Sequence, residues 1–299
     1  MSDNNANRIQ MLERIKESCD EDDFLVKAVR FTRKNQRIIL ERESAEHPVI
    51  GRGSDAKIIV SGRTVLEAAS AHQGKKVCIL NPGCATFPGG DVAKGKSGFE
   101  EDLCRTSAFY KCIAYETCWK GFYLPHRRQP NPLHTDDIIY SPDVIVFKTM
   151  KEDPAVFQDK DNQFTIDILT CSPPEYRKPA EGSPDIIGKE ELQSLLYKRC
   201  RKILQTASLM GAEVFILRDF GKGTYKSRTQ LTAEAFRKAL EETPGLFETV
   251  EFAMGPTDRS KTTYLTYQRV FYPNSSVLKM DNSHKEQDTV CEIREEEKL

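Results

Sequence analysis

Val144, Ile145, Val146 and Phe147 form an unbroken apolar run. A strand that is apolar at every position is normally covered on both faces, because neither face can be left in water. The sheet that contains it therefore needs a layer of other structure on each side. Among the common architectures, this requirement favours an α/β arrangement in which helices flank a central sheet.

Apolar strand-like segments and helical segments alternate along most of the chain, which indicates the same fold class. The spacing of apolar residues predicts helices at 64–72, 98–119, 189–210 and 232–242. Short apolar or β-branched runs predict strands at 57–60, 76–80, 143–147, 164–169, 214–217, 247–254 and 264–272.

The first fifty residues are predicted to form an extension that contains a helix and short strands. Residues 5–19 have the spacing of an amphipathic helix, with a stripe made of Ile9, Leu12 and Ile15. Short strands are predicted at 24–31 and 37–40. We expect residues 1–50 to form an accessory segment packed on the core.

Residues 51–273 are then expected to form the main domain, and the polar, charged residues 274–299 a disordered tail. A stretch with Pro, Gly and Ser at 179–188 predicts a mobile loop.

Composition limits the class of partner and the compartment. The 299 residues contain 44 Lys and Arg against 45 Asp and Glu, so direct DNA binding is not expected. No apolar run is long enough to span a bilayer, and no signal peptide is recognised. The nine cysteines include no Cys-x-x-Cys pair, which favours reduced core thiols. We expect a cytoplasmic or nuclear protein with no membrane partner.

Two neighbouring segments are candidates for chemistry. The first, 88–91, has the sequence Pro-Gly-Gly-Asp, and glycines of this kind let a backbone approach a phosphate. The second, 97–101, places the carboxylates of Glu100 and Glu101 at the start of a predicted helix. A phosphate cradle beside paired carboxylates suggests a nucleotide-sugar site where a glycosidic bond is broken.

Each segment also has a plain structural interpretation. Ser97 followed by Glu100 matches a capping box, in which Glu100 only satisfies the helix start. Gly89 and Gly90 match an ordinary turn after a strand. Residues 221–225 follow a predicted strand and contain two more glycines, which serve equally well as a turn or as a backbone cradle for a diphosphate.

Four blocks in a fixed order carry a family resemblance. They are the stretch from Asn81 to Ser107, residues 137–147, residues 168–174, and residues 212–225. Together they resemble the microbial-type poly(ADP-ribose) glycohydrolases, a branch of the macrodomain fold, over roughly residues 55 to 255. The resemblance implies a three-layer, macrodomain-like α/β fold with a mixed sheet flanked by helices and an N-terminal helical and strand extension.

The resemblance also implies roles for individual residues. Glu101 matches the catalytic acid, which protonates the leaving oxygen, and Glu100 matches the residue that binds ribose hydroxyls. Asn81 matches an Asn at a strand end that holds a ribose hydroxyl or fixes the turn. Gly89 and Gly90 match the first phosphate and ribose loop. The second loop corresponds to Gly221, Lys222, Gly223, Thr224 and Tyr225, with Tyr225 packing on the distal ribose.

Three positions depart from the family pattern. Asp91 replaces a third glycine, where a carboxylate either repels a diphosphate or points to solvent. Phe99 replaces a Gln and removes a hydrogen-bonding group. Arg63 stands where macrodomains commonly carry an acidic residue that reads the adenine amino group, and a guanidinium cannot accept that hydrogen bond. Arg105, on the same helix as Glu101, is interpreted as a solvated or salt-bridging residue.

His126 and His134 flank a Pro- and Arg-containing stretch without a common metal-ligand spacing, so they are interpreted as loop histidines. No metal and no cofactor are expected. The sequence thus predicts a hydrolase, specifically a glycosidase that acts on poly(ADP-ribose) or ADP-ribosylated protein and releases ADP-ribose. The alternatives are a catalytically impaired module that binds ADP-ribose, suggested by Asp91 and Phe99, and a relative with another nucleotide-derived substrate, suggested by Arg63.

Overall fold

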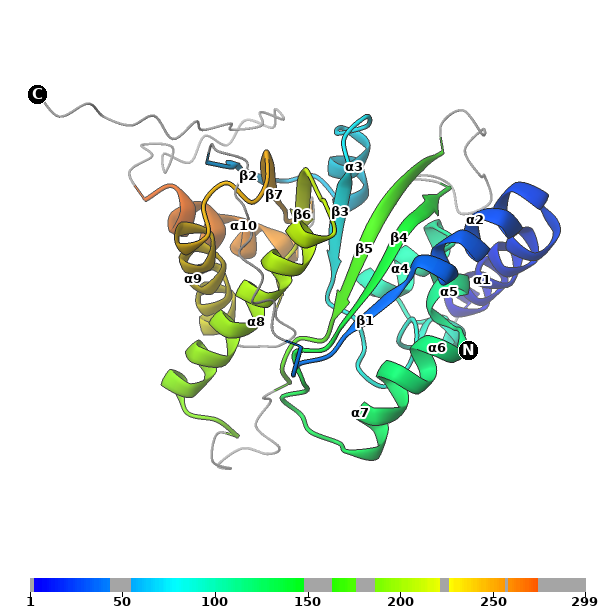
Figure 1. Cartoon of the computed structure of the whole chain (residues 1–299), viewed down its shortest axis with the longest axis horizontal. Helices are drawn as coiled ribbons and strands as arrows, with labels where there is room; N and C mark the ends of the chain where they lie inside the picture. Colours follow the sequence, from blue (N-terminus) through cyan, green and yellow to red (C-terminus); the bar gives the residue numbers. More distant parts are fainter. Residues whose placement is uncertain are drawn as a thin grey trace, which may run out of the picture.

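Seven strands form one mixed sheet in the order β1-β4-β5-β3-β6-β7-β2, with helices on both faces (Figure 1). The computed structural model describes residues 3–43, 55–147, 163–175, 186–220, 226–255 and 258–273. The expected three-layer α/β class is confirmed. The strands are β1 (Arg37–Ile39), β2 (Lys57–Ser61), β3 (Val77–Asn81), β4 (Ile138–Val146), β5 (Phe164–Cys171), β6 (Val214–Leu217) and β7 (Thr249–Ala253).

Pairing within the sheet explains why the central strands are apolar throughout. Strand β3 pairs in parallel with β5 and β6, and β7 pairs in parallel with β6 and β2. Strand β4 is antiparallel to both β1 and β5. Alternate residues of β3 point into different cores, because Cys78 and Leu80 belong to one hydrophobic cluster while Val77 and Ile79 belong to the other.

The first cluster lies under three long helices, which contribute Leu196, Phe236 and Tyr267 among others. These helices are α8 (Lys189–Leu209), α9 (Lys226–Glu242) and α10 (Asp258–Phe271). The second cluster lies under helices that include Leu12 and Leu103. They are α1 (Asp3–Glu21), α2 (Asp23–Asn35), α3 (Val65–Ser70), α4 (Phe99–Thr106) and α5 (Phe109–Ile113).

A third, smaller cluster packs Phe122 and Tyr123 on Ile139 of β4. It comes from three short helical segments that follow one another without a break, α6 (Glu116–Cys118), the π-helical η2 (Trp119–Tyr123) and α7 (Leu124–Arg128). One further turn of 3₁₀ helix, η1 (Val92–Lys94), lies between β3 and α4.

Two predicted strands are helices. Residues 24–31 lie in α2, whose buried side chains Leu25, Val29 and Thr32 have helical spacing and whose N-terminus is capped by Asp22. Residues 264–272 largely lie in α10. There the rings of Tyr267 and Phe271, one helical turn apart, stack with centroids 6.2 Å apart.

The helix predicted over 98–119 is interrupted at Ser107, so that prediction is also wrong. Ser107 has an extended backbone (φ −150°, ψ 170°) and forms an isolated bridge with Val146 of β4. The flanking backbone follows it onto the sheet, since the N–H of Ala108 donates to the carbonyl of Ile145 at 2.9 Å. These sheet contacts replace the helical hydrogen bonds that would have joined α4 to α5.

The predicted N-terminal helix is confirmed as α1, with Leu12 and Ile15 buried, and the strand predicted at 37–40 is confirmed as β1. Strand β1 is part of the sheet, because it pairs with β4. Helix α1 is part of one helical layer, because Leu12 and Ile15 belong to the second hydrophobic cluster. The division into 1–50, 51–273 and 274–299 stays a prediction. The tail at 274–299 and most of the loop at 179–188 lie outside the described residues.

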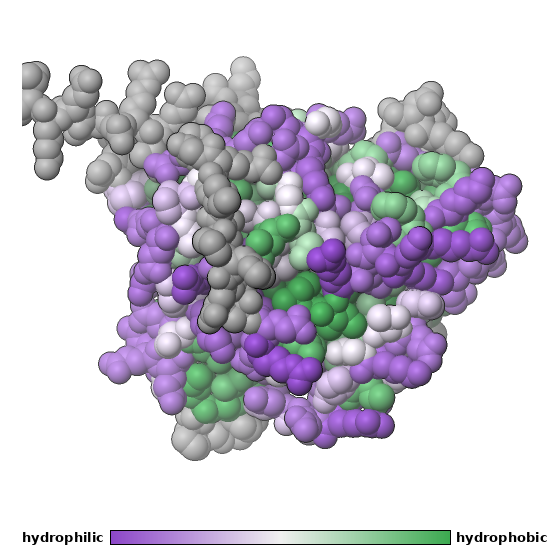
Figure 2. All heavy atoms as spheres, viewed as in Figure 1, coloured by the Kyte–Doolittle hydropathy of each residue, from purple (hydrophilic) through white to green (hydrophobic). Residues whose placement is uncertain are grey.

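All eight cysteines of the described residues are free, and seven of them are buried. Burial raises the pKa of the thiols of Cys19, Cys112, Cys118 and Cys171 to about 12, so these side chains stay protonated at neutral pH. The face shown in Figure 2 is mainly hydrophilic, with a hydrophobic patch near the middle of the view. Within the described ranges, no helix has the length and apolar character needed to cross a membrane.

Candidate active site

One row of residues across the sheet marks the carboxyl ends of the parallel strands. Asn81 of β3 is the register partner of Thr170 in β5, and Thr170 is the partner of Ile139 in β4. On the other side of β3, the pairing with β6 ends at Ile79 and Ile216. Arg218 directly follows Leu217, the last residue of β6. Parallel strands expose their ligand sites at this edge.

Asn81 lies at the middle of this row and is completely buried. Its amide Nδ2 donates to the hydroxyl of Thr170 at 3.2 Å and to Oε1 of Glu100 at 3.4 Å. The amide oxygen of Asn81 is buried and has no hydrogen-bond partner within the described residues. Asn81 is therefore hydrogen-bonded to Glu100, and its amide oxygen can accept a hydrogen bond from one further donor.

Glu100 is 4% exposed and is held from two sides. Besides the contact with Asn81, its Oε2 accepts a hydrogen bond from the backbone N–H of Cys84 at 2.7 Å. The capping-box interpretation is wrong, because the N-cap of α4 is Gly98, which has no side chain, and Glu100 reaches away from the helix start. Glu100 instead fixes the loop that follows β3.

Glu101 is the more accessible of the two glutamates and lies against the glycine turn. Its Oε1 accepts the backbone N–H of Asp91 at 3.2 Å. Gly90 has φ +58°, and a Cβ atom there would stand 2.6 Å from Glu101 Oε1 and 3.4 Å from Glu100 Oε2. Only glycine lets this backbone approach both carboxylates. Gly83 is close-packed as well, because a Cβ would meet Thr170, Asn81 and Glu100 within 3 Å.

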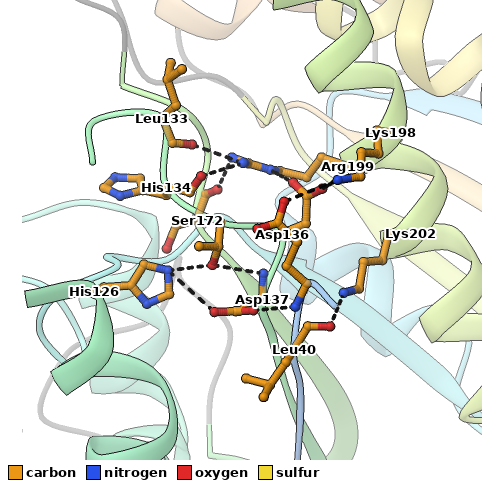
Figure 3. A network of polar contacts seen from close by, with 12 residues as sticks. Leu40, His126, Leu133, His134, Asp136, Asp137, Ser172, Lys198, Arg199 and Lys202 are labelled. Carbon is orange, nitrogen blue, oxygen red and sulfur yellow. Dashed lines mark hydrogen bonds and ion pairs between the residues drawn. The ribbon is translucent and has the colours of Figure 1, made fainter. Parts of the chain in front are cut away.

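A buried ion pair holds the loop before β4 onto helix α8, near the same edge of the sheet (Figure 3). Arg199, 1% exposed, donates from Nε to Asp136 Oδ1 at 2.6 Å and from Nη1 to the carbonyl of Ser172 at 2.9 Å. Ser172 lies two residues after Thr170. The arginine thereby anchors the end of β5, on which the contact with Asn81 depends.

His126 is part of the same network and does not lie in an extended loop as predicted, because it is buried in α7. Its ring nitrogens contact the carbonyl of Phe122 at 2.8 Å and the hydroxyl of Thr135 at 2.9 Å. His134 does lie in a loop, with φ +53°. The arrangement gives His126 a structural place between α7 and the loop that leads to β4.

A separate hollow of about 340 Å³ lies at the other end of the sheet, near the starts of β2 and β7. Ile58, Leu240, Phe247 and Phe271 line it, together with the charged rim residue Arg237. It contains none of the residues gathered around Asn81, so its size alone does not make it the reaction site.

The comparisons with known proteins agree with this geometry. Residues 7–149 match the family model described as microbial-type PARG, catalytic domain, where PARG denotes poly(ADP-ribose) glycohydrolase. The matched segment contains the glycine turn and both glutamates. A solved structure of PARG from Thermomonospora curvata superposes with a TM-score of 0.76 at 25% identity, covering 88% of this chain and 99% of that one. Residues 7–149 of the chain therefore match the microbial-type PARG family, and the fold is similar to that of solved PARG structures.

Two further structures show the same relationship. The Thermomonospora curvata PARG bound to the inhibitor ADP-HPD gives a TM-score of 0.73 at 23% identity, over 88% of this chain and 99% of that one, and shares the fold. PARG from Deinococcus radiodurans in complex with ADP-ribose gives 0.69 at 26% identity, over 81% of this chain and 96% of that one. No curated protein matches the sequence.

Against the PARG pattern, the carboxylate of Asp91 turns outward. Its side chain is 49% exposed, and Oδ1 forms an ion pair with Nζ of Lys94 at 2.7 Å. Only the backbone N–H of Asp91 faces Glu101. Of the two possibilities for this position, the structure favours the one in which the carboxylate points to solvent.

Phe99, where PARG proteins have a Gln, supports a second unusual residue. The guanidinium carbon of Arg218 lies 4.6 Å from the centroid of the Phe99 ring. Burial lowers the pKa of Arg218, an effect that Asp219 and Asp102 oppose, and the guanidinium stays charged at neutral pH. Arg218 was not among the residues predicted from the sequence, although the residue directly after a buried parallel strand is a general candidate for a ligand site.

Arg63 does not point freely toward a base. Its Nε lies 3.7 Å from Oε1 of Glu251, a fully buried residue of β7. The same carboxylate accepts from the hydroxyl of Ser61 at 2.6 Å and contacts Nε2 of His72 at 3.2 Å. An acidic group is thus present in this region, but it comes from β7 and not from the segment after β2.

The remaining sequence-predicted residues divide into two groups. Arg105 is buried and salt-bridging, since it donates to Asp102 at 2.6 Å and to the carbonyl of Lys96 at 2.8 Å. The second loop lies outside the described residues, and its predicted binding residues stay predictions; they are Gly221, Lys222, Gly223, Thr224 and Tyr225.

Proposed function

We propose that this protein is a glycohydrolase that releases ADP-ribose from poly(ADP-ribose) or from ADP-ribosylated protein. The observation that supports it most directly is the junction of Glu100, Glu101 and the Gly90 turn at the carboxyl edge of the sheet. This junction brings an accessible carboxylate, a fixed carboxylate and glycine backbone into one place. The match to the family model and the ADP-ribose complex of the similar Deinococcus radiodurans protein support the same substrate class.

The two glutamates divide the work according to their surroundings. Glu100 accepts from Cys84 N–H and Asn81 Nδ2, so it is suited to orient ribose hydroxyls and the loop around them. Glu101 has one oxygen on the Asp91 N–H and is more open to solvent, which suits the group that exchanges a proton with the substrate. These roles stay proposals.

In the proposed reaction, protonated Glu101 gives its proton to the leaving oxygen as the glycosidic C1–O bond breaks. The ribose passes through an oxocarbenium-like transition state. Water then adds its oxygen to C1, and the proton that it loses returns to the Glu101 carboxylate. The products are ADP-ribose and a shortened polymer or unmodified acceptor, and no redox partner or metal enters the balance.

Arg218 is proposed to favour the phosphates of this substrate. It directly follows β6, shortly before the predicted second loop in the sequence, and its guanidinium lies over the ring of Phe99, the residue before Glu100. Such a plane presents N–H donors in a geometry that matches a phosphate. The protein is further proposed to act in the cytoplasm or nucleus, where the free thiols described above remain reduced.

The test is to incubate the protein with poly(ADP-ribose) and to measure free ADP-ribose for the wild type, Glu101→Gln and Glu241→Gln. Glu241 is an exposed residue of α9 that pairs with Arg237, and it serves as the matched control. The proposal expects release by the wild type and by Glu241→Gln, and a loss of at least about a hundredfold for Glu101→Gln. Equal rates for all three proteins would reject Glu101 as the acid.

A second candidate function is a module that binds ADP-ribose without cutting it, which the replacement of the family Gln by Phe99 favours. Calorimetric titration separates the two. Tight binding of ADP-ribose by a wild-type protein that releases none from polymer would support the binding module.

A further inference from the structure

An exposed aromatic ring stands at the entrance of the glycine turn. Phe87 is 47% exposed, which is unusual for so large an apolar side chain. Its carbonyl accepts the N–H of Gly90 at 3.1 Å, so residues 87–90 close a tight turn. The two ends of such a turn lie within about 7 Å of each other. Because Gly90 touches Glu101, Phe87 begins a turn whose other end contacts the candidate acid.

An arginine is sandwiched between this ring and a second one. The guanidinium carbon of Arg127 lies 4.5 Å from the Phe87 centroid and 5.3 Å from that of Trp119. Arg127 is exposed, and within the described residues no carboxylate forms an ion pair with it. A stacked guanidinium uses its faces for the rings and keeps its in-plane N–H donors for another partner. We call Phe87, Arg127 and Trp119 the aromatic–arginine cluster.

In the order of the sheet, the helical segments that carry Trp119 and Arg127 pack on the other side of β3 from β6, the strand that Arg218 follows. Strand β6 pairs with β3 on one flank. Trp119 and Arg127 belong to η2 and α7, and the η2 rings of Phe122 and Tyr123 pack on Ile139 of β4. In the sheet, β4 lies beyond β5 on the other flank of β3. Behind the cluster, the ring of Tyr123 lies 6.5 Å from that of Trp119, and its buried hydroxyl has no hydrogen-bond partner within the described residues.

We propose that the aromatic–arginine cluster binds the ADP-ribose unit adjoining the one that is released, with its adenine on the open face of Phe87 and its diphosphate on Arg127. This inference rests on the proposed function and specifies its substrate as the polymer. A released unit that extends toward Arg218 leaves the next unit on the side of the cluster. Each polymer unit carries both a base and a diphosphate, which are the two groups that the cluster is equipped to bind.

The physical basis is the same as in proteins that bind single-stranded nucleic acids. Bases stack on exposed aromatic rings whatever their sequence, and arginine adds cation–π and phosphate contacts. A protein acceptor has neither a base nor a diphosphate at a fixed distance from the scissile bond, and free ADP-ribose has no adjoining unit. The cluster should therefore bind polymer more tightly than either of them.

The experiment measures binding in the Glu101→Gln background, so that polymer remains intact. Equilibrium dissociation constants are determined for free ADP-ribose and for poly(ADP-ribose) of defined length, with Phe87→Ala, Arg127→Gln and the control Phe24→Ala. Phe24 is 52% exposed on α2 and tests the loss of a surface ring elsewhere. Thermal unfolding of each variant checks that its fold is retained.

Phe87→Ala and Arg127→Gln are each expected to raise the dissociation constant for polymer about tenfold while leaving that for ADP-ribose within about twofold. Phe24→Ala is expected to change neither. Equal weakening of both ligands, an unchanged polymer affinity, or no polymer binding at all would overturn the inference. Oligoadenylate that competes as well as poly(ADP-ribose) would point to a nucleic-acid site instead.

The outcome is independent of the cleavage test. A protein that binds polymer through Phe87 but releases no ADP-ribose in the wild-type background would retain the subsite and lose the glycohydrolase proposal. If the wild type releases ADP-ribose but Phe87→Ala leaves the polymer affinity unchanged, the glycohydrolase proposal stands and the subsite is rejected.

Discussion

Gly90 and Glu101 are in direct contact across the glycine turn: a Cβ atom at Gly90 would stand 2.6 Å from Glu101 Oε1. The backbone of Gly90 has φ +58°, so the turn needs glycine for two separate reasons. The contact joins the glycine turn, which is proposed to bind phosphate, to Glu101, which is proposed to be the catalytic acid. It also offers a way to disturb the proposed acid without changing it.

Gly90→Ala is expected to lower the rate of ADP-ribose release at least about tenfold, because the added methyl group displaces the Glu101 carboxylate. The left-handed backbone adds about 1–2 kcal/mol of lost unfolding free energy. Gly74→Ala is the matched control, since Gly74 has φ +90° but nothing within 4 Å of its Cβ position. Similar activity losses in both variants would show that strain alone, and not displacement of Glu101, is responsible.

Asp91→Gly restores the glycine of the PARG pattern and is expected to change the release rate by no more than about twofold. The reason is that the Asp91 carboxylate is directed to Lys94 and solvent, while its N–H, which glycine retains, holds Glu101. Initial rates and the dissociation constant of ADP-ribose check this. A large gain in either would mean that the native carboxylate enters the site and impairs it.

Arg218→Gln is expected to weaken ADP-ribose binding about tenfold, because it removes the cation that lies over Phe99, next to the two glutamates. Phe99→Leu removes the stacking partner and should have a smaller effect of the same sign, about 0.5–1 kcal/mol, or roughly two- to fivefold. Calorimetric titration at two salt concentrations measures both. Arg201→Gln, an exposed position of α8, is the control. Unchanged affinity in Arg218→Gln would remove this residue from the phosphate site.

Much of the fold follows from local patterns, as β3 and α8 illustrate. The strand predicted at 76–80 and the helix predicted at 189–210 coincide with them to within one residue at each end. In both, burial on the sheet agrees with local propensity, so a single pattern determines the element. The position of Glu100 and Glu101 at the start of a helix also follows from the order of glycine turn and helical spacing.

The errors occur where one pattern fits two structures. In 24–31 and 264–272, apolar residues are so frequent that they fit both the strand period and the helix period. The tertiary arrangement then determines which structure forms. At Ser107 the helix ends, because the backbone pairs with Val146 of β4. Val146 lies about forty residues later in the sequence, so a local pattern cannot predict this contact. Thr170 and Glu251 were missed for a related reason, since the register of the sheet, which local patterns do not give, determines their neighbours.

Asp136→Ala is expected to destabilise the protein by about 3–5 kcal/mol, because it leaves the fully buried Arg199 without its carboxylate. Chemical denaturation measures this. The control is Glu241→Ala, whose partner Arg237 is exposed and whose loss should cost less than about 1 kcal/mol. A small effect of Asp136→Ala would show that Asp136 is not needed to keep Arg199 buried and that the loop before β4 is held by other contacts.

Asp167 should make stability depend on pH in the direction opposite to most carboxylates. Burial raises its pKa above the ordinary 3.8, although Tyr140 and the N–H of Asp143 donate hydrogen bonds that lower it. The folded state then binds the proton more tightly than the unfolded state, so the free energy of unfolding falls as pH rises from the unfolded value through the raised pKa.

Measured by denaturation across this window, the stability of the wild type relative to Asp167→Asn is expected to decrease with rising pH. The exposed Glu116 provides a control of opposite sign, because Lys120 lowers its pKa and its small contribution is lost as pH falls. A wild-type advantage over Asp167→Asn that is constant or grows with pH would mean that the hydrogen bonds from Tyr140 and Asp143 outweigh burial.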